Sequence, residues 1–259
     1  MPAMASIDDQ AGRGERLLIL GCERTCKANH SSTIQEEPWH CTRIAGGKAQ
    51  VSVTIQPIER SMVSKVADVH MEAFAGYMNT QIGRQYVRSF IEWFMRASDA
   101  ISLAAIADGT VVGYVVGAPT GYEQRLNRDL LLVAAFGMLL HPWVFLEGRF
   151  RRQVHVRLEN LVRRHSDTVS ESDLPQPTVI LVGIGVSPEM QGRQVGRLLM
   201  NAFESEARRR GARSLSLTVY KSNSAARRLY EKCRWSPWEG VDGETILYYL
   251  VLSDTLGSG

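Results

Sequence analysis

The sequence predicts an α/β protein with a mixed, mainly antiparallel sheet flanked by helices, and three observations support this fold class. Short apolar segments bounded by Gly or Pro alternate with segments of helical periodicity. The pair Asp108-Gly109 joins two apolar segments and is a strong hairpin signal, so the first part of the sheet is expected to be antiparallel. The run 179–186 leads directly into a Gly-bearing turn and a helix, as a buried strand does before a crossover.

The first half of the chain predicts one strand, two helices and a hairpin. Alternating residues that end at Pro57 indicate the strand, and aromatic and aliphatic residues at helical spacing indicate the helices. Gly76 is expected to separate the two helices, and Pro119 is expected to end the hairpin pairing. The expected elements are a strand at 51–55, helices at 60–77 and 80–97, and strands at 101–107 and 110–117.

The second half predicts the rest of the sheet. The apolar run ends at Ser187-Pro188, and the helix after the turn stops at Gly211, directly behind three arginines. A strand, a helix and two further strands follow. The expected elements are a strand at 179–186, a helix at about 197–210, a strand at 213–219, a helix at 223–232, and strands at 235–239 and 245–252.

Two regions depart from this pattern. Residues 1–48 have no sustained periodicity, which predicts a poorly ordered N-terminal extension before a domain at 51–253. Residues 120–176 predict a helical insertion within that domain, with an apolar helix at 126–140 and a basic amphipathic helix at 145–164. The insertion either caps an acceptor cleft with its arginines or packs on the domain or on a second subunit, as in a homodimer.

Composition excludes several classes of protein. The net charge of +3 is too small to predict a nucleic-acid partner, and no apolar run is long enough to span a bilayer. The basic helix leaves a contact with a membrane surface open. The chain has 4 cysteines and no disulfide framework, which predicts a cytoplasmic location. Cys22, Cys26 and His30 do not match a familiar zinc spacing, so no metal is expected.

The turn Gln191-Gly192-Arg193-Gln194-Val195-Gly196 carries the main functional signal. A strand, this turn and a helix follow one another directly. Such an arrangement directs several backbone N–H groups, and the positive end of a helix dipole, towards one point. The sequence therefore predicts an anion site, most naturally for a phosphate or pyrophosphate group.

Two motifs in this half of the chain resemble those of one enzyme family. The turn is similar to the acetyl-CoA-binding motif of the GNAT N-acetyltransferase superfamily, which reads Gln/Arg-x-x-Gly-x-Gly/Ala, and a second motif is similar to the last conserved helix of that family. The matching residues are Val186, Pro188, Gln191, Gly192 and Gly196 in the first motif, and Asn223, Ala226 and Tyr230 in the second. The likeness extends over residues 51–252 by order of elements. It departs at Gln194, where the family has Gly; a side chain there is compatible with binding if φ stays negative.

The resemblance implies a fold, an activity and a cofactor. The fold is the acyl-CoA N-acyltransferase fold. The activity is transfer of an acetyl group from acetyl-CoA to a primary amine of a small molecule, such as an amino sugar, directly within a ternary complex. Acetylation of a protein or peptide amine is an alternative, although the sequence shows no acidic cluster for it. A non-catalytic acyl-CoA-binding module is another, because Gln194 is unusual and 179–186 contains no carboxylate.

The resemblance also assigns the binding residues. The turn from Gln191 to Gly196, together with Arg197, would hold the pyrophosphate of CoA. Ile184, Gly185 and Val186 would face the pantetheine arm where their strand separates from its neighbour. Asn223 and Ala226 would contact the same arm from the last helix.

Catalytic roles follow from the same likeness. The Val186 N–H would stabilise the oxyanion, and Tyr230 would protonate the leaving thiolate, because a phenol of ordinary pKa keeps its proton at pH 7. A core tyrosine with no catalytic role is the alternative for Tyr230. The general base is not identified by the sequence; Glu72 is our candidate, and His70, Glu171, Asp173 and an ordered-water relay stay open.

Overall fold

A nine-stranded sheet runs through the described part of the chain in the order β2-β3-β4-β5-β6-β7-β9-β8, with β1 paired to β6 off this path. The computed structural model describes residues 4–6, 40–46, 49–75, 78–140, 173–238 and 243–252. The strands are β1 Met4–Ser6, β2 His40–Gly46, β3 Ala49–Pro57, β4 Ile101–Ala107, β5 Thr110–Pro119, β6 Thr178–Val186, β7 Ser214–Tyr220, β8 Ser236–Pro237 and β9 Thr245–Val251. The helices are η1 Arg60–Met62, α1 Val63–Ala73, α2 Met78–Ile82, α3 Arg84–Arg96, α4 Tyr122–Leu140, η4 Pro188–Met190, α6 Val195–Arg209 and α7 Ser224–Lys232.

The sheet is mixed and mainly antiparallel, as the sequence predicts. Strands β2 to β6 pair antiparallel in succession, and so do β7 with β9 and β8 with β9. Only β6 with β7 and β1 with β6 are parallel. The chain passes from β6 to its parallel neighbour β7 through the crossover helix α6, which is the usual way to connect parallel strands.

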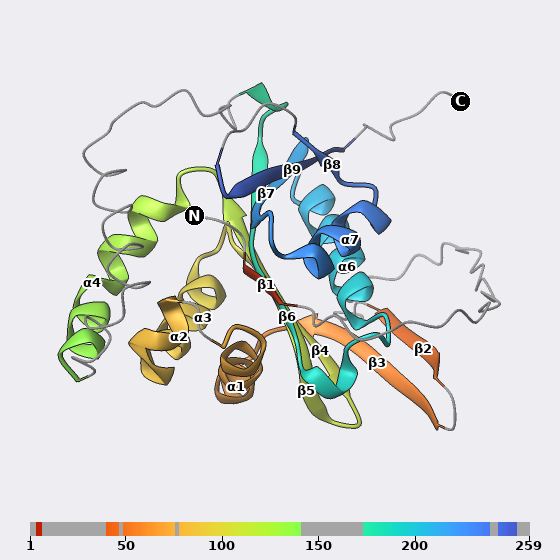
Figure 1. Ribbon diagram of the computed structural model, residues 1–259, viewed down its shortest axis with the longest axis horizontal. Helices are drawn as coiled ribbons and strands as arrows, with labels where there is room; N and C mark the ends of the chain where they lie inside the picture. Colours follow the sequence, from red (N-terminus) through yellow and green to blue (C-terminus); the bar gives the residue numbers. More distant parts are fainter. Residues whose placement is uncertain are drawn as a thin grey trace, which may run out of the picture.

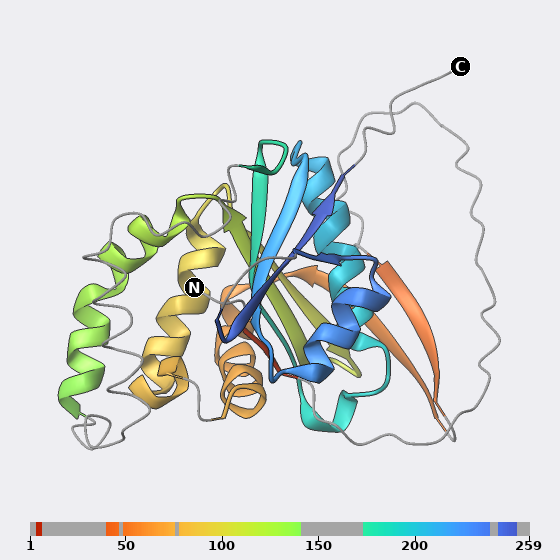
Figure 2. The same cartoon turned by 45° about the horizontal axis from the view of Figure 1, so that its top comes forward.

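Helices cover both faces of the sheet and enclose two apolar cores. Helices α1 to α4 lie on one side and α6 and α7 on the other (Figures 1 and 2). The core under α6 contains Leu199 and Phe203 packed against strand residues such as Leu215. The core under α1 and α3 contains Val66, Phe90 and many more buried side chains. Within the described ranges, no helix combines the length and apolarity needed to cross a membrane.

Several predicted elements differ in extent from the observed ones, three of them in ways that matter for the fold. The helix expected at 80–97 is divided at Gly83, whose φ of 114° is unfavourable for other residues, so that α2 and α3 are separate. The insertion helix expected at 126–140 begins earlier, at Tyr122. The strand expected at 235–239 is only two residues long. The second insertion helix, at 145–164, lies outside the described residues.

Two strands fall within residues 1–48. This range contributes two strands, β1 and β2, where a poorly ordered extension was expected. Strand β2 continues the antiparallel sheet beyond β3, and β1 lies along β6. The local sequence gives no signal for either strand, because each forms through pairing with a strand elsewhere in the chain. The division into an extension and a domain at 51–253 stays a prediction.

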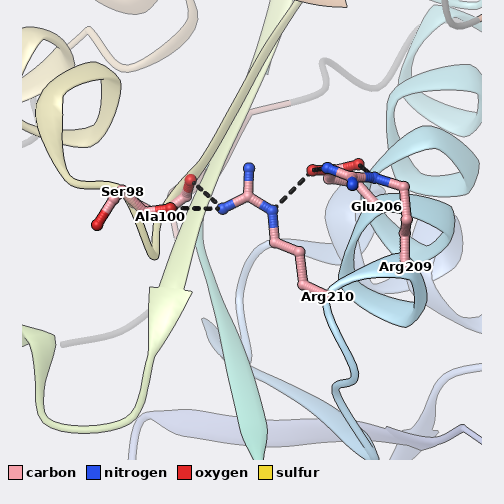
Figure 3. Close-up of polar contacts among 5 residues, drawn as sticks. All are labelled: Ser98, Ala100, Glu206, Arg209 and Arg210. Carbon is pink, nitrogen blue, oxygen red and sulfur yellow. Dashed lines mark hydrogen bonds and ion pairs between the residues drawn. The ribbon is translucent and has the colours of Figure 1, made fainter. Parts of the chain in front are cut away.

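A polar cluster ties α6 to the opposite helical layer. Arg210 donates through Nη1 to the carbonyls of Ala100 and Ser98, at 2.8 and 3.2 Å, and through Nε to the carboxylate of Glu206, at 2.7 Å (Figure 3). Arg209 donates to the same carboxylate at 2.7 and 2.8 Å. Because Ser98 and Ala100 immediately precede β4, this cluster fixes the end of α6 against the end of the sheet where β4 begins.

Candidate functional site

Strand β6 separates from β7 partway along its length. The two strands pair only from Thr178 to Ile180 on β6 and from Ser214 to Ser216 on β7. Beyond these residues β7 continues to pair with β9 as far as Tyr220, while β6 continues to pair with β5 as far as Val186. Beyond Ile180 and Ser216 the two strands are therefore no longer paired, so that β6 has separated from β7 by the time it reaches Ile184. This place of separation is called the gap below.

The backbone of β6 directs hydrogen-bonding groups into this gap. The Ser187 N–H donates to the Val112 carbonyl at 2.9 Å, so this opposed pair is hydrogen-bonded. Bonded and non-bonded pairs alternate along an antiparallel ladder, and Val186 is opposite Gly113 in the same register. Val186 and Ile184 therefore turn their N–H and C=O groups away from β5, towards the gap.

The other face of β6 is in close contact with a buried aromatic cluster. A Cβ atom on Gly185 would lie 2.8 Å from Cε1 of Tyr114 and 3.3 Å from Phe74. Glycine at this position thus lets the strand approach the aromatic side chains more closely than any other residue could. On Gly183 the nearest atom to an added Cβ is 3.5 Å away, on Val116, which is ordinary van der Waals contact.

Beneath Gly185, His70 and Tyr114 form a buried hydrogen-bonded pair. Nδ1 of His70 lies 2.6 Å from the Tyr114 hydroxyl, and both residues are 0% exposed. Burial lowers the pKa of His70 to about 3 and raises the pKa of Tyr114 well above its ordinary value. Both groups are therefore neutral at pH 7. An imidazole with so low a pKa is a weak proton acceptor, so the structure gives His70 no support as the general base.

The turn after β6 has the backbone geometry of an anion site. A 3-10 turn, Pro188–Met190, is followed by Gly192 with φ 72° and then by α6. The first N–H of this helix with an acceptor in the described backbone is that of Leu198, which donates to the Gln194 carbonyl at 3.1 Å. The preceding amides belong to the first helical turn, where N–H groups have no intrahelical acceptor. Arg193 and Arg197 are exposed beside them.

Gln194 does not keep the negative φ that its side chain favours. It is the N-cap of α6 with φ 63° and ψ 5°, in the left-handed region. From the sequence, a side chain at position 194 is expected to be compatible with binding if φ stays negative, and in the structure this φ is positive. The short turn between η4 and α6 imposes this conformation, and Gln194 adopts the backbone conformation that the glycine of the family would adopt without strain.

Helix α7 borders the other side of the gap. Asn223 is its N-cap, and the Asn223 Oδ1 accepts from the Ala226 N–H at 3.1 Å. Tyr230 is 0% exposed, with its ring centroid 5.6 Å from that of Tyr248 and 6.3 Å from that of Trp235. Strand β1 contacts β6 as well as β7 and α7, so it lies between β6 and these two elements.

The structure gives the carboxylate candidates for the general base no support. Glu72 is exposed on α1 and lies two residues from the buried His70, hence about 200° around the helix. Asp173 is exposed, and Glu171 lies outside the described residues. In the described part of the chain, no group of three or more His, Cys, Asp or Glu side chains could hold a metal ion. Cys22, Cys26 and His30 lie outside that part.

Tyr114 is the site residue that sequence reasoning missed. Its strand was expected, but nothing local pairs it with His70, which is 44 residues away. In the sequence, His70 is one residue of the helix expected at 60–77, and the periodicity of that helix does not indicate its partner. A glycine opposite an aromatic residue on an adjacent strand would have been the only available signal, and it requires the register to be known.

A separating strand, an amide-rich turn and a crossover helix, within a mixed sheet covered on both faces, define an acyl-CoA N-acyltransferase fold. A sequence profile described as the acetyltransferase (GNAT) family matches residues 66–234, more than half of the chain. The protein belongs to this family. No curated protein sequence matches the chain.

Solved structures share the fold at low sequence identity. One is the PaiA N-acetyltransferase of Thermoplasma acidophilum in complex with coenzyme A, at 14% identity and a TM-score of 0.51, covering 78% of this chain and 99% of that one. Another is an aminoglycoside N-acetyltransferase in complex with CoA, at 13% identity and a TM-score of 0.50, covering 76% of this chain and 95% of that one.

Proposed function

We propose that the protein transfers an acetyl group from acetyl-CoA to a primary amine of a small molecule, directly within a ternary complex. One observation carries the proposal: Ile184 and Val186 direct backbone groups into a gap whose strand leads straight into the amide-rich start of α6. A pantetheine arm contains amide groups and can pair with such a strand as a peptide does. Family membership and the CoA-bound structures of the same fold support this interpretation.

In this proposal the donor is held at both ends. The turn from Gln191 to Gly196 and the start of α6 bind the pyrophosphate through main-chain N–H groups, and Arg193 and Arg197 add positive charge. Ile184, Gly185 and Val186 align the pantetheine arm. Asn223 and Ala226, at the start of α7, approach that arm from the opposite side of the gap.

The chemical step forms one bond and breaks another. The neutral amine attacks the thioester carbonyl, and the Val186 N–H stabilises the developing oxyanion. The carbon–sulfur bond then breaks, and Tyr230 gives its proton to the thiolate. The ammonium proton leaves to a base or through water. The exposed position of Glu72 gives it no support as that base, and a relay of water to bulk solvent is the alternative.

A small-molecule acceptor is preferred to a peptide. A cationic peptide would be recognised by clustered carboxylates, and the sequence shows no acidic cluster that would build such a groove. We place the catalytic unit at 51–253, with the helical insertion at 120–176, and propose a cytoplasmic location. The acceptor would be found by screening amines with acetyl-CoA and detecting free thiol.

The test combines binding and turnover. The wild-type protein should bind CoA in calorimetry and release thiol from acetyl-CoA with at least one amine. Tyr230→Phe should slow that release about 100-fold or more without changing the Kd for CoA. Tyr248→Phe is the matched control, because Tyr248 is also buried and its hydroxyl is bonded to Glu231 at 2.8 Å.

Each other outcome has a distinct meaning. Unchanged turnover in Tyr230→Phe would remove Tyr230 from its role. Binding of CoA without turnover for any amine would favour the non-catalytic module. No binding of CoA by folded protein would refute the proposal.

A further inference from the structure

The gap between β6 and β7 is occupied by the protein's own N-terminal segment. Strand β1, Met4–Ser6, runs parallel to β6, with Met4 opposite Gly183, Ala5 opposite Ile184 and Ser6 opposite Gly185. It also contacts β7 and α7, the two elements across the gap. Figure 1 shows this short red strand lying against β6. It therefore lies where β6 has left β7 and has no other partner on that side in the described sheet.

Backbone alternation identifies the groups that β1 uses. Gly183 and Gly185 direct their backbone groups towards β5. Of the three β6 residues that lie opposite β1, only Ile184 therefore offers it an N–H and a C=O. In a parallel ladder centred on Ile184, its carbonyl pairs with the N–H of Ser6 and its N–H with the carbonyl of Met4. These are the Ile184 groups that the proposed function assigns to the pantetheine arm. The strand and the arm cannot use them together.

We propose that β1 is an internal competitor of acyl-CoA: it closes the donor site in the resting protein and must leave before the cofactor can bind. This inference rests on the proposed function, because it concerns the same site. Closure lowers the fraction of molecules that are competent to bind, and the apparent Kd rises by the same factor. A contact of about two backbone hydrogen bonds corresponds to a factor of about 30.

The test uses the full chain with one backbone hydrogen bond removed. Ser6→Pro deletes the N–H that pairs with the Ile184 carbonyl, because proline has no amide proton. The Kd for CoA, measured by calorimetry, should fall about fivefold relative to the wild type, which corresponds to the loss of about one hydrogen bond. Asp9→Pro is the matched control: it places the same residue in the N-terminal segment outside β1, and its Kd should equal that of the wild type.

Hydrogen exchange provides a second readout that does not depend on CoA. The Ile184 amide should exchange slowly in the wild type without cofactor and faster in Ser6→Pro. Equal Kd values, with equal exchange at Ile184, would overturn the inference while leaving the proposed function intact. The same gain in Asp9→Pro would also overturn it. If no variant binds CoA, the proposed function fails and the competition fails with it.

Discussion

The two ends of β6 are held in different ways. At the closed end, the hydroxyls of Thr178 and Ser214 lie 2.7 Å apart across β6 and β7, and Ser214 Oγ also donates to the Pro175 carbonyl at 2.8 Å. The Arg213 N–H donates to the Pro177 carbonyl at 2.8 Å. At the open end, the neighbour of β6 is a three-residue strand held through the backbone. A gap in the middle of a sheet is thus maintained by concentrating side-chain bonds at one end.

The electrostatics of the two ends also differ. Near the closed end, the carboxylate of Glu206 is 5% exposed as a side chain and receives bonds from Arg209 and Arg210. Behind the open end, His70 and Tyr114 are neutral. The structure near the closed end is therefore stabilised by charged groups, whereas the structure behind the open end contains an uncharged buried pair. Substitutions and pH should affect the two ends differently.

The largest expected effect is a steric one at the closed end. In Gly117→Ala the new Cβ would lie 2.5 Å from both the Ile180 carbonyl and the Phe203 ring, and the backbone cannot move aside easily. Overpacking of this kind should lower the free energy of unfolding by about 3 kcal/mol. Urea denaturation measures it. Gly183→Ala, at the open end, is the control and should change little; equal losses in the two variants would contradict the difference between the ends.

As the pH falls, the buried His70 behind the open end should lower the free energy of unfolding before the Glu206 cluster near the closed end does. Unfolded His70 takes up a proton below its ordinary pKa of 6.5, whereas the folded residue does so only near pH 3. The unfolded state binds more protons between these values, so stability falls as pH decreases, with a slope approaching about 1.4 kcal/mol per unit. Between pH 7.5 and 5 the wild type should lose about 2 kcal/mol more than His70→Gln does. If the free energy of unfolding changed equally with pH in the two proteins, His70 would not be the cause of the loss.

The charged cluster near the closed end should respond at lower pH and to a different substitution. Burial tends to raise the pKa of Glu206, but the bonds from Arg209 and Arg210 hold it below the ordinary value. Its contribution is complete above the ordinary glutamate pKa and is lost as pH falls through the lowered one. Glu206→Gln should reduce the free energy of unfolding by about 1.5 kcal/mol at pH 7.

Within this cluster, the two arginines provide a matched comparison. Arg210→Ala should be more damaging than Arg209→Ala, because only Arg210 also binds the carbonyls of Ser98 and Ala100. Arg209 is the more exposed partner, at 57% against 31% for Arg210. The Tm should therefore be lower for Arg210→Ala than for Arg209→Ala. The reverse order would mean that Arg210 is not the main link between α6 and the segment that precedes β4.

The smallest effect is expected beyond the open end, in the turn. Gln194→Gly relieves a left-handed backbone and should stabilise the protein by about 1 kcal/mol. Arg193→Gly changes a residue of the same turn that has no positive φ and should destabilise instead. Urea midpoints at constant m-value would measure both. A loss of stability in Gln194→Gly would mean that its side chain makes a compensating contact.

The elements with strong local signals could be predicted from the sequence. The Asp-Gly hairpin, the run that became β6 and the amphipathic α6 were all expected, because periodicity and turn residues specify them locally. Strands β1 and β2 could not be predicted, since each exists only through a partner elsewhere in the sheet. The His70–Tyr114 pair was missed for the same reason. The positive φ of Gln194 results from the demands of the turn, which override the preference of the residue.

The free edge of β6 inside the sheet has a further consequence for behaviour at high concentration. Unpaired strand edges recruit extended segments of other chains, and this is a common origin of aggregation. By pairing with β6 at Ile184, β1 hides that edge in the structure. A protein whose N-terminal strand is detached should therefore self-associate more readily, and adding CoA should restore its solubility.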